Sequence, residues 1–120
     1  ISSSHRVYYS GDTALFPEFS EIGKRLGPFD LTLFEVGAYN NMWSDVHLGP
    51  EQAVKAHGMV QGKLMMPVHW GTFDLALHNW TEPAERFYKK ASEDEIQTCY
   101  PPLGQIIVPG KEPSEPWWRL

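Results

Sequence analysis

Two residues whose side chains can bind a metal ion follow strand-like runs in the sequence. Asp12 comes shortly after the β-branched and aromatic run 5–9, and His69 comes directly after the apolar run 64–68. In open α/β sheets, ligands collect beyond the carboxyl ends of the strands. A carboxylate and an imidazole are donors that suit zinc. The positions of these two residues therefore favour a metal site at one edge of a sheet.

A structural role for both residues stays open at this point. An aspartate within Ser-Gly-Asp-Thr is often a turn or helix-cap residue, and a single histidine after an apolar strand is often hydrogen-bonded within the fold. Hydrolytic zinc sites usually have at least three protein ligands and one open position for water. Residue chemistry alone therefore supports both a metal-binding and a structural interpretation of Asp12 and His69.

The elements that would position these residues belong to a layered α/β domain. Apolar residues at helical spacing, with Gly or Pro at the ends, predict helices over 17–26, 50–61 and 82–91. Strand-like runs lie at 5–9, 29–36, 64–68, 96–100 and 105–108. This alternation is typical of a sheet flanked by helices. Since no linker interrupts the chain, we expect a single domain over 1–120, with an extended, Pro-rich tail over 109–120.

Composition limits the class of protein. With 120 residues, 42% hydrophobic and 21% charged, the chain resembles a globular domain with one core. A net charge of −5 and the lack of a Lys or Arg cluster argue against a nucleic-acid partner. Cys99 is the only cysteine, which is typical of a cytoplasmic protein. There is no initiator Met and a strand-like run begins almost at once, so we expect the chain to begin within a domain.

Five runs in the first two thirds of the chain match one enzyme family in order and at natural spacing. They are Tyr8-Tyr-Ser-Gly-Asp-Thr13, Phe19-x-x-Ile22-Gly-x-Arg-x-Gly-Pro-Phe-Asp-Leu31, Gly37-Ala-Tyr39, Val46-His-x-x-Pro-Glu-Gln-Ala-Val54 and Val68-His-Trp-Gly-Thr-Phe73. They resemble the metallo-β-lactamase superfamily, and most closely the branch that contains N-acylphosphatidylethanolamine phospholipase D. The resemblance implies the C-terminal half of an αβ/βα sandwich, with one mixed sheet and flanking helices. It also implies a hydrolase that uses metal-activated water on a phosphodiester or a related ester.

The resemblance assigns roles to individual residues. It implies that Asp12 is the carboxylate that bridges two metal ions and that His69 is the last histidine ligand. It places His47 near the metals, where an imidazole could donate a proton. Two zinc ions are the expected cofactor of the complete protein, although manganese or iron also suit such ligands. Residues that could line the substrate pocket are Tyr39, Trp43 and His78.

The chain also departs from the family. The family's signature His-x-His-x-Asp-His does not occur, since no two of the five histidines are two residues apart. We therefore expect a missing N-terminal half or a second chain to supply the remaining ligands, and the chain to be inactive by itself. The expected substrate is a small-molecule or lipid-like phosphodiester. Trp117 and Trp118 could lie at a membrane interface, but packing against the domain is favoured.

Two other functions remain as alternatives. The chain could be a non-catalytic binding module, whose sheet edge and apolar inner face dock onto another chain. It could instead be a mononuclear zinc protein that uses Asp12, His69 and His47, which requires the loop over 40–47 to fold onto the strand ends.

Overall fold

The computed structural model describes residues 4–108 and 110–119, so the ends of the expected 1–120 domain and Pro109 of its tail lie outside the described residues. The elements, in chain order, are β1 (Val7–Tyr9), α1 (Phe19–Leu26), β2 (Phe29–Glu35), the 3-10 helix η1 (Asn41–Trp43), α2 (Pro50–Met59), β3 (Gly62–Val68), α3 (Glu82–Glu93), β4 (Gln97–Thr98) and the 3-10 helix η2 (Trp117–Arg119). This order confirms the three predicted helices and the α/β class.

The four strands form one sheet in the order β1-β2-β3-β4. All pairings among these strands are parallel, which differs from the mixed sheet that we expected. The cause is the connections, because each pair of neighbouring strands is joined through a helix, α1, α2 or α3. A helical crossover returns the chain to the same end of the sheet and so makes the next strand parallel.

The last two predicted strands differ most from the structure. The run 96–100 shortens to β4, and the run 105–108 is not a strand. Ile106 is 84% exposed, and the backbone around it forms turn hydrogen bonds, such as Gln105 N–H to Pro102 C=O at 2.9 Å. β-Branched residues favour a strand only where neighbouring strands or a core pack against them. This segment has neither, so its local preference is not realised.

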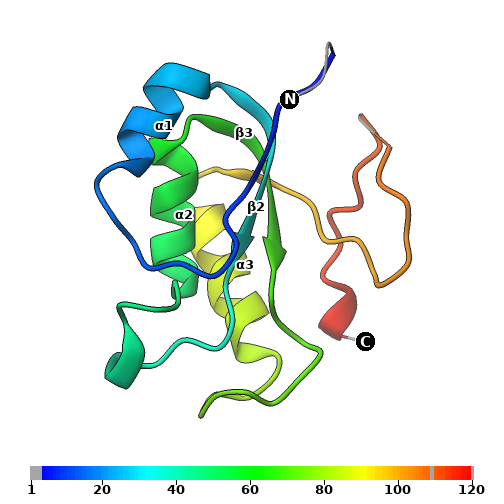
Figure 1. Cartoon of the computed structure of the whole chain (residues 1–120). Helices are drawn as coiled ribbons and strands as arrows, with labels where there is room; N and C mark the ends of the chain where they lie inside the picture. The colour runs from blue at the N-terminus through cyan, green and yellow to red at the C-terminus, as the bar shows by residue number, and fades with distance from the viewer. Residues whose placement is uncertain (1–3, 109, 120) are drawn as a thin grey trace.

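The helices cover one face of the sheet (Figure 1). Between the helices and the sheet lies a core that includes Phe19 of α1, Phe34 of β2 and Phe87 of α3, all fully buried. Gly23 allows α1 and α2 to approach closely, because a Cβ at this position would lie 2.3 Å from the Met59 carbonyl oxygen. The helical layer therefore holds β2 and β3 in place from one side.

The opposite face of the sheet is partly open. Val7 and Tyr9 are exposed, whereas Tyr8 between them packs against the core. Their register partners Leu31 and Leu33 share the open face, since alternate residues of a strand point the same way. The C-terminal tail lies on the side of the sheet away from α1 and α2 (Figure 1). Even so, Val7 and Tyr9 of β1 stay exposed, so part of this face has no covering element among the described residues.

The tail packs back on the domain, as its tryptophans predicted. Trp118 is only 6% exposed and its indole lies 5.1 Å from the Tyr100 ring, between centroids. Trp117 stacks on Trp70 at 5.5 Å. Within residues 4–108 and 110–119, no helix has the length and apolar content that crossing a bilayer requires.

Candidate metal centre

The carboxyl ends of three parallel strands bring four possible metal ligands together. Asp12 follows β1, Glu35 is the last residue of β2, and His69 comes directly after β3. The loop between η1 and α2 adds His47. One donor atom from each of these residues lies within 4.8 Å of the others. The sequence placed Asp12 and His69 at this edge, and the structure brings them together with His47.

Glu35 lies at the centre of the group and is 1% exposed. Its Oε1 accepts hydrogen bonds from the backbone N–H groups of Thr13 at 2.7 Å and Leu48 at 3.2 Å. Its Oε2 lies 2.7 Å from His47 Nδ1 and 3.4 Å from His69 Nδ1. A buried carboxylate is tolerated only when its oxygens have such partners. Glu35 therefore joins the segments that carry the other three residues.

The contact with Glu35 fixes which nitrogen of His47 is free. An ionised carboxylate only accepts hydrogen bonds, so Nδ1 of His47 carries the proton in this contact. Among the described residues, its Nε2 has no hydrogen-bond partner. The His47 and His69 rings are stacked, with centroids 5.3 Å apart. Both line a cavity of about 260 Å³ together with Asp12 and Trp43.

Asp12 and His69 form the pair that fits a metal ion. Asp12 Oδ1 lies 3.7 Å from His69 Nε2. Two donors at about 2.1 Å from a tetrahedral zinc ion lie about 3.4 Å apart, so the observed separation is close to that requirement. Metal-binding histidines usually donate their other ring N–H to a carboxylate or carbonyl. Glu35 occupies that position at His69 Nδ1.

The backbone at His69 is unusual and depends on a neighbouring glycine. His69 has a φ of 63°, in the left-handed region that residues with a Cβ rarely adopt. A Cβ at Gly37 would lie 2.2 Å from the His69 carbonyl oxygen. The segment after β2 can therefore approach the end of β3 only because residue 37 has no side chain.

Glu35 is the site residue that the sequence analysis missed. In the sequence, Glu35 is only one of several polar residues within the mostly apolar run 29–36. Its signal was its place at the end of β2, the strand that lies between β1 and β3. A charged residue at the end of a central strand is buried and next to both neighbouring strand ends, which is where Asp12 and His69 lie.

Of the three predicted pocket residues, one lines the cavity of the donor group and the other two stack on each other beside it. Trp43 lines the same cavity as His47, and its Nε1 donates to the Ala38 carbonyl at 2.7 Å. Tyr39 and His78 stack on each other at 4.5 Å. Tyr39 donates its hydroxyl to Glu82, and burial together with this bond raises the Tyr39 pKa to about 12.

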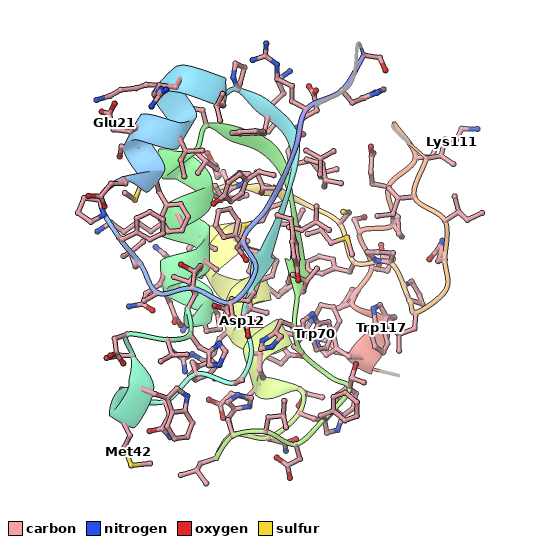
Figure 2. All side chains as sticks on the ribbon, in the orientation of Figure 1. Asp12, Glu21, Met42, Trp70, Lys111 and Trp117 are labelled. Carbon is pink, nitrogen blue, oxygen red and sulfur yellow. The ribbon has the colours of Figure 1, made fainter. Side chains whose placement is uncertain are left out.

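His78 also accepts a hydrogen bond from the Ala38 N–H at 3.1 Å. It thereby connects the loop after β3 to the segment after β2. This loop borders a second cavity of about 510 Å³, which shares Ala38, His69 and Leu75 with the smaller one. Trp70 and Trp117, both labelled in Figure 2, lie on the wall of this second cavity.

Comparison with known proteins places these residues in a family context. The family model described as "Beta-lactamase superfamily domain" matches residues 1–70. The match includes all four residues of the donor group. An uncharacterized protein of Mycobacterium tuberculosis is 45% identical over 124 residues, which cover 100% of this chain and 33% of that protein.

Two further relatives carry descriptive names. The N-acyl-phosphatidylethanolamine-hydrolyzing phospholipase D 1 of Caenorhabditis elegans is 36% identical over 106 residues, which cover 83% of this chain and 30% of that protein. The solved structure of a metallo hydrolase from Ignicoccus hospitalis has a TM-score of 0.59 and 25% identity, and the match covers 88% of this chain and 39% of that one. The chain thus spans about a third of the length of the curated relatives that it matches.

Proposed function

This chain belongs to the β-lactamase superfamily domain family and is similar in structure to a metallo hydrolase. We propose that it carries part of the active site of a hydrolase that uses metal-activated water on a phosphodiester or a related ester. The observation that carries the proposal is the group formed by Asp12, Glu35, His47 and His69 at the strand ends. Its two carboxylates and two imidazoles are the residue types that metal hydrolysis requires.

Asp12 and His69 are the proposed metal ligands. A bound divalent ion would lower the pKa of a water molecule and stabilise negative charge that develops on the substrate. Zinc is the proposed ion, and manganese or iron fit the same donors. Asp12 has two carboxylate oxygens on an exposed side chain, so it would be able to hold more than one ion.

Glu35 and His47 supply the remaining chemistry. Glu35 holds Nδ1 of His47, so that Nε2 can give a proton to the leaving group. Glu35 also orients His69, because its Oε2 lies next to Nδ1 of the His69 ring. Glu35 is therefore a positioning residue, and His47 is the proposed proton donor.

A lipid-like phosphodiester is the proposed substrate class. The name of the Caenorhabditis elegans relative describes hydrolysis of an N-acyl-phosphatidylethanolamine, which is a phosphodiester. Trp43 borders the donor group, and His78 borders the adjoining cavity; we propose that they contact substrate, with Tyr39 stacked behind His78. A cytoplasmic location, suggested by the single cysteine, is part of the same proposal.

The remaining metal ligands must come from outside the sequence given. It contains no His-x-His-x-Asp-His, and it spans about a third of its relatives. We propose that an N-terminal segment or a second chain supplies these ligands, and that the chain alone is inactive. The exposed apolar side chains of β1, Val7 and Tyr9, favour docking of that part. The same side chains support the alternative function, a non-catalytic interaction module.

The test uses the complete protein that contains this chain. Metal content and hydrolysis of bis(p-nitrophenyl) phosphate are measured for Asp12→Ala and His69→Ala. Both variants should lose bound metal and most of the activity. Asp94→Asn is the matched control, because Asp94 pairs with Lys90 on the surface, and it should keep both properties. Full activity in the two variants would refute the proposal and favour the interaction module.

A further inference from the structure

The C-terminal tail contributes an aromatic wall to the larger cavity beside the donor group. Trp117 lines this cavity from the tail, and Trp70 lines it from the segment after β3. Their rings are stacked, with centroids 5.5 Å apart and planes 25° apart. Figure 2 shows the two labelled indoles next to each other. The tail, which is far from the donors in sequence, therefore shapes the space next to them.

One acidic residue of α3 holds the tail in place. Glu85 Oε1 accepts from Trp118 Nε1 at 2.7 Å and from Arg119 Nε at 2.8 Å, and Oε2 accepts from a second guanidinium nitrogen of Arg119 at 2.6 Å. The guanidinium also lies over the Tyr88 ring, 4.6 Å from its centroid. The bonds from Arg119 hold the Glu85 pKa below its usual value, so the carboxylate stays charged. We call Glu85, Trp118 and Arg119 the tail clasp.

The clasp fixes the position of Trp117 through its neighbours in the chain. Trp118 is buried against Tyr100 and lies 5.4 Å from Trp70, with the two rings at 85°. Arg119 is tied to Glu85 on the other side. Because the two residues that follow it are anchored, Trp117 is held where its ring stacks on Trp70. An exposed ion pair alone would contribute little, but here a forked Arg contact acts together with a buried indole.

The cavity wall is mainly apolar. Its members besides the indoles include Met66, Pro67, Val68, Phe73, Tyr100 and Leu103. Ligand cavities combine such a wall with a few polar groups that fix orientation. Here the polar groups that do chemistry lie at the shared border, where His69 lines both cavities. A ligand with its ester at the donors would thus place an adjoining apolar group against Trp117.

We propose that the tail clasp positions Trp117 as a specificity-determining residue that binds the apolar group of the substrate. This proposal rests on the proposed function for the place of the ester. It assigns to Trp117 direct contact with the ligand and to Glu85 a positioning role. The occupant of the larger cavity is therefore a hydrocarbon portion of the same substrate molecule.

The test measures binding without catalysis, on the complete metal-free protein. The fluorescence of N-phenyl-1-naphthylamine reports occupation of the cavity, and 1-butanol, 1-hexanol and 1-octanol displace it. Each added methylene should strengthen displacement about fourfold, as burial of a methylene group does. Trp117→Ala should weaken probe binding about tenfold, and Trp117→Phe should keep most of it.

Glu85→Gln should reduce the dependence on alcohol length, because an amide cannot pair with both nitrogens of Arg119. Glu93→Gln is the matched control, since Glu93 pairs with Lys89 on the same helix, and it should behave as the wild type. A wild-type protein that does not bind the probe would overturn the proposal, because another segment would then fill the cavity. Binding that is equal in Trp117→Ala, Glu85→Gln and wild type, with the same length dependence throughout, would also overturn it.

Failure of the proposed function would look different. In that case metal and hydrolysis would be unaffected by Asp12→Ala and His69→Ala, while probe binding would still depend on Trp117.

Discussion

The Glu35 side chain is almost completely removed from water. We predict that Glu35→Gln lowers the metal affinity of the complete protein about 10–100-fold, the usual effect of losing a carboxylate behind a metal-binding histidine. The amide keeps one acceptor oxygen but cannot accept from both His47 and the backbone as the carboxylate does. Competition titration with a zinc indicator measures the change. An affinity equal to that of the wild type would show that Glu35 does not orient the ligands.

His57 gives the folded state a dependence on pH. Its ring is buried, with Nδ1 2.8 Å from Thr32 Oγ1, and burial lowers its pKa from 6.5 to about 4. Between these two pH values the unfolded chain binds more protons than the folded one. The free energy of unfolding is therefore highest above pH 6.5, as far as His57 is concerned, and decreases as the pH falls toward 4. The loss should be about 2–3 kcal/mol at pH 4.5.

Urea unfolding of the wild type and His57→Gln, at pH 7 and pH 4.5, checks this prediction. The variant cannot take up the proton, so the free energy of unfolding should fall less with acid than in the wild type. Equal losses in the two proteins would mean that the buried ring does not titrate on unfolding.

The donor group was only partly visible in the sequence. Asp12 and His69 could be placed because each follows a strand, and parallel strands end at one edge. His47 lies in an irregular loop, so only resemblance to a family singled it out. Glu35 was missed because nothing in the local sequence distinguishes it from the rest of its strand, and its contacts with two histidines exist only after the strands pair.

At the scale of elements, two helical glycines should respond in opposite directions. Gly23→Ala should lower the free energy of unfolding by about 1–3 kcal/mol, because its Cβ would lie 2.3 Å from the Met59 carbonyl and push α1 from α2. Gly58→Ala should raise it by about 0.5–1 kcal/mol, because a Cβ there meets nothing within 4 Å. Urea unfolding measures both. Stabilisation by both changes would refute the close contact between the helices.

The same scale shows what could be predicted of the fold. The helices follow from apolar spacing, since each buries one face, and the α/β class follows from their alternation with strands. The run 105–108 also has the residue types that favour a strand, but Ile106 remains exposed because none of the described strands pairs with it. Strand formation depends on a partner, and the partner is not written in the local sequence.

At the scale of the whole molecule, the reactivity of Cys99 can report whether the C-terminal tail stays packed on the domain. Its thiol is buried and burial raises its pKa to about 11. Its neighbour Tyr100 donates its backbone N–H to Pro113 of the tail. We predict that Ellman's reagent reacts slowly with the wild type at pH 8 and faster with Glu85→Gln, in which the tail is held less firmly. Equally rapid labelling of both proteins would show that the thiol is accessible without any opening.

At His69, the residue type that would make the fold more stable differs from the one that the proposed metal site needs. A left-handed conformation costs a residue with a Cβ about 1–2 kcal/mol, and glycine avoids that cost. A laboratory evolution campaign that rewards heat tolerance alone should therefore enrich glycine at position 69, and each improved clone would have discarded a proposed metal donor. Histidine would be retained at position 69 only if the selection also required metal-dependent activity.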